Sequence, residues 1–148
     1  MSIDLVKLAR EIIEKNQYLV MASPWISILC YAYDKDWNFY VASMDNSRHV
    51  QEISKNNTIS FAIFDSHQDW GLGVGLQIEG KIEKTGTLLA SKIYFSRKFP
   101  YGNISGAFAL GFKKLLANKT YSFYKIAPTK IWMNDPEEEF DTRIEIKL

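Results

Sequence analysis

The sequence predicts a mostly β fold, an antiparallel barrel with helices packed outside it. Aromatic residues make up 14% of the 148 residues and fall in short segments beside β-branched neighbours. Residues 74–83 alternate apolar with polar side chains, as a strand with one wet and one buried face does. Roughly six or seven such segments occur, and most follow one another as hairpin neighbours rather than as βαβ units.

The first element is an amphipathic helix that ends at Lys15-Asn16. Its apolar side chains recur at helical spacing and form one stripe: Leu5, Leu8, Ala9, Ile12 and Ile13. Ser2 is the expected N-cap, with Asp4 in the first turn, where a carboxylate favours the helix dipole.

Three strands are expected next. Residues 18–23 and 25–33 are apolar and aromatic, and Pro24 interrupts them. Residues 34–38 carry Asp and Asn and indicate a hairpin loop, so residues 39–43 form an antiparallel third strand.

A short helix is predicted over residues 47–55, with Ser47 as its N-cap. Residues 58–65 are strongly β-prone and form the fourth strand. In the strand over 74–83, the side chains on the core face are Val74, Leu76, Ile78 and Ile82.

The second half of the chain alternates helical and β segments. Residues 87–99 form a helix capped by Thr87 and ended by Pro100, and residues 107–116 also have helical character. Two further strands, 121–126 and 130–134, flank Ala127-Pro128, and residues 142–148 form an edge strand. No repeat or linker divides the chain, so residues 1–148 are expected to form a single domain.

Composition excludes several classes of protein. Eighteen basic and 17 acidic residues give a net charge of +1, which argues against a nucleic-acid binder. No uncharged run reaches the ~18 residues of a membrane span, and charged residues interrupt any N-terminal targeting signal. The single cysteine, Cys30, cannot form an intramolecular disulfide, and its apolar run predicts a buried, inert thiol. These features predict a cytoplasmic protein without membrane contact.

Two patterns that suggest a ligand fail on their spacing. Gly71-x-Gly73-x-Gly75 is not a dinucleotide fingerprint, because the third glycine would fall on Leu76 and a strand follows instead of a helix. A flexible loop that enters the strand is the better interpretation. His49 and His67 have no ligand partners at metal-site spacing, so no metal site is expected and no catalytic residue can be named.

The junction between the third strand and the second helix is a candidate phosphate site. Ser43 ends the strand, Ser47 begins the helix and Arg48 lies in its first turn. Unpaired amides of a helix N-terminus, two hydroxyls and a guanidinium suit an anion. The other interpretation is an ordinary capped helix with a solvated arginine.

The order of these elements resembles the pyridoxamine 5'-phosphate oxidase-like family, the FMN-binding split barrels. A helix, a Pro24 hairpin, Ser43-x-x-x-Ser47-Arg48, a helix and a Val/Ile-rich strand follow one another in the same order. Similar phrases occur in small bacterial members: Pro24-Trp25-Ile26-Ser27, Tyr31-Ala32-Tyr33-Asp34, Ile63-Phe64-Asp65-Ser66 and Glu79-Gly80-Lys81-Ile82-Glu83. The resemblance runs to about Tyr101, and more loosely to Asp135.

This resemblance implies a six-stranded split barrel that forms a homodimer, with FMN in each of two clefts at the interface. It implies that the FMN phosphate is held by the positions of Ser43, Ser47 and Arg48. His49 stands where relatives often carry a second basic residue. The flavin ring is expected along the strand that contains Trp25, Ile26 and Ser27.

The expected function is therefore that of an FMN-dependent oxidoreductase. Its small-molecule substrate and its reductant are not indicated, and residues that bind pyridoxal phosphate in the true oxidases are not recognisable. Two alternatives share the fold: a non-catalytic protein that binds flavin, haem or another planar ligand, and a dimer without a cofactor.

Overall fold

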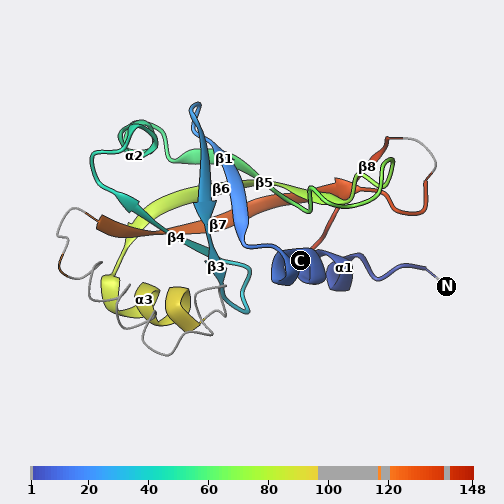
Figure 1. Cartoon of the computed structure of the whole chain (residues 1–148), viewed down its shortest axis with the longest axis horizontal. Helices are drawn as coiled ribbons and strands as arrows, with labels where there is room; N and C mark the ends of the chain where they lie inside the picture. Colours follow the sequence, from blue (N-terminus) through green and yellow to red (C-terminus); the bar gives the residue numbers. More distant parts are fainter. Residues whose placement is uncertain (1, 97–116, 118–120, 139–140) are drawn as a thin grey trace.

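In the part of the chain that the structure describes, eight strands form one antiparallel sheet that curls into a half-barrel with flanking helices (Figure 1), which confirms the mostly β fold. The computed structural model describes residues 2–96, 117, 121–138 and 141–148. The elements follow in this order: α1 (Leu5–Lys15), β1 (Tyr18–Ala22), β2 (Ile26–Cys30), β3 (Ala32–Tyr33), β4 (Phe39–Met44), α2 (Arg48–Ile53), β5 (Thr58–Phe64), β6 (Gly75–Thr85), α3 (Thr87–Ser96), β7 (Tyr121–Asn134) and β8 (Arg143–Glu145).

The connection between β2 and β3 brings the two ends of the sheet together. The strand order is β2-β1-β5-β6-β7-β4-β3, with β8 added to β7. β2 and β3 lie at opposite ends of this path, yet only Tyr31 separates them in the chain. Because β2 pairs with β1 while β3 pairs with β4, the chain passes from one end of the sheet to the other at this residue.

The prediction of a single strand over residues 25–33 is wrong, because Tyr31 separates this segment into β2 and β3. The Tyr31 ring is fully buried, and its hydroxyl donates to the carbonyls of Ile13 at 2.7 Å and Asn16 at 2.9 Å. Its amide still bonds the Gln17 carbonyl at 3.2 Å, whereas the next residue, Ala32, already pairs with β4. The residues that the structure describes contain eight strands, whereas a six-stranded barrel was expected.

The two strands predicted at 121–126 and 130–134 are one strand, β7. A bulge accommodates Pro128, because the register shifts between Glu79 and Gly80 and places Pro128 opposite Gly80. A Cβ on Gly80 would lie 2.8 Å from the Ala127 carbonyl oxygen, so the close approach of the two strands requires glycine there.

The barrel interior contains the predicted core residues of β6. Leu76, Ile78 and Ile82 are at most 2% exposed, whereas Val74 precedes the strand and is only partly buried. The apolar stripe of α1 packs against this interior, as its spacing predicted. Cys30 is only partly buried, so the expected full burial of its thiol is wrong.

The residues that cap two helices, α1 and α3, differ from those predicted. Asp4, not Ser2, caps α1, because its carboxylate accepts the Lys7 amide at 3.0 Å. α3 begins at Thr87, but the Ala90 amide donates to the Gly86 carbonyl at 3.2 Å, so Gly86 holds the capping position. The end of the predicted helix at 97–99 and the helical segment at 107–116 lie outside the described residues.

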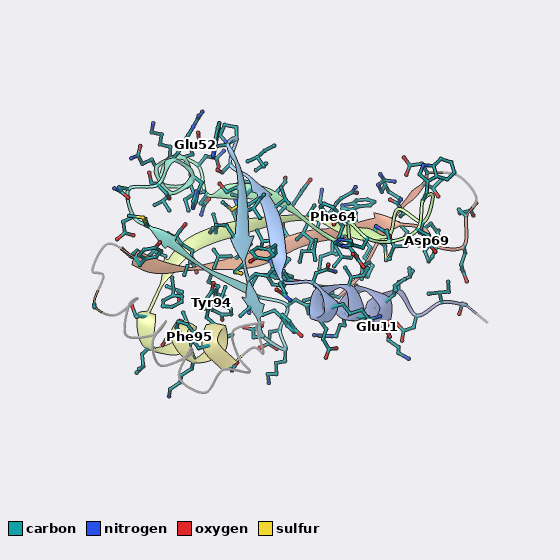
Figure 2. All side chains as sticks on the ribbon, viewed as in Figure 1. Glu11, Glu52, Phe64, Asp69, Tyr94 and Phe95 are labelled. Carbon is teal, nitrogen blue, oxygen red and sulfur yellow. The ribbon has the colours of Figure 1, made fainter. Side chains whose placement is uncertain are left out.

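α3 covers the face of β4 and β7 opposite the barrel interior. Tyr94 and Phe95 project from α3 (Figure 2), and their ring centroids lie 5.6 and 6.3 Å from that of Phe123 on β7. Tyr40 and Ala42 of β4 face this second small core. The alternate residues of β4 therefore point into the barrel.

The glycine-rich segment forms the loop between β5 and β6, as expected. Gly71 and Gly73 have φ of 89° and 55°, values that glycine adopts readily. Over the part of the chain that the structure describes, no helix has the length and apolar character needed to cross a membrane.

Candidate functional site

The candidate site lies where β4 ends and α2 begins. Along β4, Phe39, Val41 and Ser43 are buried on the barrel face, and Ser43 is the last of them. Ser47 is the N-cap of α2, as predicted, with φ −67° and ψ 152°. Its hydroxyl makes no cap hydrogen bond and is turned instead toward a histidine.

Ser43, Ser47 and His49 form one group, which we term the hydroxyl cluster. His49 Nε2 lies within hydrogen-bonding distance of Ser43 Oγ and 3.2 Å from Ser47 Oγ. Ser43 is 6% exposed and His49 is half-buried. Burial lowers the pKa of the His49 imidazole below its usual 6.5, although the charge of Glu52 opposes this shift. The cluster therefore offers hydrogen-bond donors without a fixed positive charge at neutral pH.

Arg48 does not join the hydroxyl cluster in this conformation. Its Nε donates to Glu52 Oε1 at 3.2 Å, one helical turn further along α2. Its guanidinium carbon lies 4.1 Å from the centroid of the Trp25 ring, a cation–π contact. The Arg48 side chain is 62% exposed. Ser43 and Ser47 thus converge on His49, while the predicted cation faces Trp25.

Glu52 also holds the turn between β1 and β2. Its Oε2 accepts the Trp25 amide at 2.9 Å and the Ser23 hydroxyl at 3.2 Å. The hydrogen bond from the Trp25 backbone lowers the pKa of Glu52 most, with further lowering by Arg48 and Ser23. We term these four residues the Glu52 clamp: Ser23, Trp25, Arg48 and Glu52. The clamp joins the Pro24 turn to α2, beside the hydroxyl cluster.

The other two residues predicted to contact a ring, Ile26 and Ser27, lie on opposite faces of β2. Ile26 points outward and is 65% exposed. Ser27 is buried and pairs with Met21, whose side chain lies in the barrel core. The structure therefore brings Trp25 and Ile26 to the surface and leaves Ser27 inside.

A second polar group lies next to the hydroxyl cluster. Ser122 on β7 is the register partner of Ser43. Asp45 accepts the Tyr124 hydroxyl at 3.0 Å and lies 3.4 Å from Lys84 Nζ. The hydrogen bond from Ser122 lowers the pKa of Asp45 most, followed by those from Tyr124 and Lys84. Burial, with Asp45 nearby, raises the pKa of Tyr124 to about 12.

The outer face of the sheet has a shallow hollow of about 450 Å³. Strand register places one residue from each of five strands in a row across this face: Ile28, Val20, Ala62, Gln77 and Trp132. The small side chains of Ala22, Ser60 and Ala62 line the hollow. The β2 side of the face carries exposed apolar residues, including Ile28, which is 70% exposed. The exposed apolar side chains thus lie on the β2 side of this face, whereas Gln77, Glu79 and Arg143 make its other side polar.

Several residues of the site are not apparent from single motifs. The spacing of Arg48 and Glu52, four residues apart on a helix, could have predicted their ion pair. Asp45, Lys84 and Tyr124 meet only through strand pairing, which local sequence does not reveal. Among residues 2–96, 117, 121–138 and 141–148, no three His, Cys, Asp or Glu side chains gather as metal ligands do.

The sheet and the strand–helix junction define a split barrel with a polar group at one end and an apolar outer face. No protein-family model matches the sequence, and no curated protein matches it. Solved structures of the same fold are nevertheless similar over most of the chain. Three of these structures share 13–15% sequence identity with this chain.

One is a candidate pyridoxamine 5'-phosphate oxidase from Listeria innocua, with TM-score 0.66 and 15% identity over 89% of this chain and 99% of that chain. A second is a protein from Clostridium acetobutylicum related to general stress protein 26 and placed in the pyridoxinephosphate oxidase family. It matches with TM-score 0.65 and 15% identity over 99% and 97% of the two chains. A haem-binding protein from Mycobacterium smegmatis matches with TM-score 0.71 and 13% identity over 99% of this chain.

The chain spans 59% of the length of that haem-binding protein. Together these similarities show that the chain has the split-barrel fold, as its sequence indicated.

Proposed function

We propose that the protein is a homodimeric, FMN-binding member of the pyridoxamine 5'-phosphate oxidase-like family and acts as an oxidoreductase. The observation that carries this proposal is the hydroxyl cluster beside Arg48, at the junction that the family resemblance assigns to the FMN phosphate. Its fold is that of proteins described as oxidase-like and as haem-binding.

The donor set of the junction fits a phosphate. Ser43, Ser47 and His49 supply side-chain donors at one point, and Arg48 is adjacent in sequence on an exposed, flexible side chain. A guanidinium can bind a phosphate through two parallel hydrogen bonds. Two carboxylates, Asp45 and Glu52, stand nearby, and each is already paired with a cation. The proposed site thus has donors that suit a phosphate, and the two nearby carboxylates weaken its attraction for an anion.

When bound, FMN would supply the hydride and electron chemistry, which no protein side chain can perform alone. In this proposal Ser43, Ser47 and Arg48 hold the phosphate and His49 donates or accepts a hydrogen bond there. In this proposal the ring lies along Trp25, in the Pro24 turn, and Ile26, at the start of β2, with the buried Ser27 behind them. The protein would thereby orient the ring and keep water from one of its faces.

The homodimer of this proposal would form through the outer face of the sheet. Ile26 and Ile28 are 65% and 70% exposed, and each begins one of two neighbouring rows that continue across five strands. A second copy can cover such a face with an isologous contact, since the same patch serves both chains. A ring along β2 would then lie at the boundary between the two chains.

Reconstitution tests the proposal. Purified protein, freed of any bound ligand, is titrated with FMN and separately with haemin while visible absorbance and heat are recorded. We expect one FMN per chain and bleaching of the bound flavin by NADPH or NADH. Bound flavin that no reductant bleaches would indicate a carrier, haemin binding alone would indicate a haem protein, and binding of neither would indicate a dimer without a cofactor.

A further inference from the structure

We infer that Glu52 is a positioning residue that restrains phosphate binding, because it holds Arg48 away from the hydroxyl cluster. This inference rests on the proposed function, since it concerns the same phosphate site. It assigns to Glu52 the control of how strongly the site discriminates a phosphorylated flavin from an unphosphorylated one.

The contacts of the Glu52 clamp oppose the rotation of the Arg48 side chain toward the hydroxyl cluster. Arg48 has two contacts on the clamp side, the Glu52 carboxylate at 3.2 Å and the Trp25 ring at 4.1 Å. It must give up both to reach an anion at Ser43 and Ser47. The hydroxyl cluster lies beside the clamp but does not include the guanidinium.

Glu52 cannot follow Arg48, because its carboxylate is fixed from the other side. Oε2 accepts the backbone amide of Trp25 at 2.9 Å and the Ser23 hydroxyl at 3.2 Å, while Oε1 faces Arg48. The Glu52 side chain is 19% exposed, against 62% for Arg48. The carboxylate is thus the fixed member of the pair and the guanidinium is the movable one.

The charge of Glu52 acts on the hydroxyl cluster as well as on Arg48. Burial lowers the pKa of His49 in the cluster, and the negative charge of Glu52 acts in the opposite direction and raises it. The same charge that favours a cation at His49 repels a phosphate bound between Ser43 and Ser47. Glu52 therefore weakens phosphate binding twice, by its hold on Arg48 and by direct repulsion.

Glu52→Gln separates the charge from the structural role. The amide oxygen of Gln can still accept the Trp25 amide, so the turn stays attached to α2, while the ion pair with Arg48 is lost. Glu11→Gln is the matched control: Glu11 pairs with Lys15 across the same i,i+4 spacing, on α1. Glu11 and Glu52 lie far apart, on α1 and α2 (Figure 2), and both variants change the net charge equally.

The experiment measures the dissociation constants of FMN and of riboflavin for the wild type and both variants, at low and high salt. We expect Glu52→Gln to bind FMN about three- to tenfold more tightly than the wild type, with riboflavin affinity unchanged. The gain should shrink at high salt, because screening weakens the charge of Glu52 in the wild type. Glu11→Gln should match the wild type for both ligands.

The outcomes separate the inference from the proposed function. Wild-type protein that binds FMN, with a Glu52→Gln variant that binds it no more tightly, would overturn the inference and leave the function standing. FMN binding by the variant but not by the wild type would support the inference most strongly. A change of equal size for FMN and riboflavin would assign Glu52 a purely structural role, and binding by no form would remove both proposals.

Discussion

His49 illustrates how the surroundings of one residue decide its chemistry. The family resemblance places a second basic residue at this position, but the imidazole is half-buried between two serine hydroxyls. Burial disfavours the charged ring and lowers its pKa. At neutral pH His49 therefore serves as a hydrogen-bond partner, and in the proposed site the positive charge for a phosphate would come from Arg48.

This lowered pKa links stability to pH. The unfolded chain, with an imidazole pKa of 6.5, binds more protons than the folded protein at mildly acidic pH. The contribution of His49 is therefore present above pH 6.5 and is lost as pH falls through the lowered folded value. The free energy of unfolding in urea should decrease between about pH 7.5 and about pH 5.5, and His49→Gln should show a smaller decrease.

His67→Gln is the control for that comparison. The His67 side chain is 94% exposed in the β5–β6 loop, so its removal should leave the wild-type decrease in place. An equal decrease in wild type and His49→Gln would show that the burial of His49 does not govern this pH range.

At the scale of elements, β6 shows how closely a periodic pattern predicts a structure. Leu76, Ile78 and Ile82 alternate with exposed charged or amide residues, as the sequence indicated. Gly80, between Ile78 and Ile82, is buried because β7 approaches closely there. The sequence of β6 alone does not predict this approach. Periodicity therefore predicts which face is buried, while the bulge depends on the partner strand.

Ile78→Ala tests that burial. Ile78 is 1% exposed, and its register partners are Phe61 and Ile131, both in the core. Removal of the buried side chain should lower the free energy of unfolding by about 2–5 kcal/mol, measured by urea denaturation. Glu83→Ala, on the exposed face of the same strand and outside the row that contains Gln77, should change it by less than about 0.5 kcal/mol. Similar losses in both variants would contradict the assignment of the two faces.

Local sequence predicts the elements better than their junctions. The helix stripe of α1 and the N-cap Ser47 of α2 follow from spacing and residue type. The break at Tyr31 does not, because it depends on hydrogen bonds to Ile13 and Asn16, which belong to a different element. The same is true of the site. Ser43, Ser47 and His49 are near one another in sequence, whereas the contact between Trp25 and Arg48 joins the β1–β2 turn to α2, with three strands between them in the chain.

At the scale of the whole molecule, the apolar outer face leads us to expect a homodimer. Ile28→Lys places a charge on the exposed residue at the β2 end of the row that crosses this face. It should convert a dimer into monomers, as measured by light scattering at micromolar concentration. Leu148→Lys changes a residue of similar exposure, 66% against 70%, beyond the end of β8 and outside this row, and should leave the dimer intact. Wild-type protein that scatters as a single chain at all concentrations would exclude the dimer.

The central claim, that the β4–α2 junction binds the phosphate of FMN, is tested most directly by Arg48→Ala. A charge-assisted hydrogen bond contributes about 1.5–3 kcal/mol, so calorimetric FMN affinity should fall about tenfold to a hundredfold in the variant. Riboflavin lacks the phosphate, and its affinity should be unchanged, which separates loss of the phosphate contact from damage to the fold. Equal FMN affinity in wild type and Arg48→Ala, or an equal loss for FMN and riboflavin, would contradict the account.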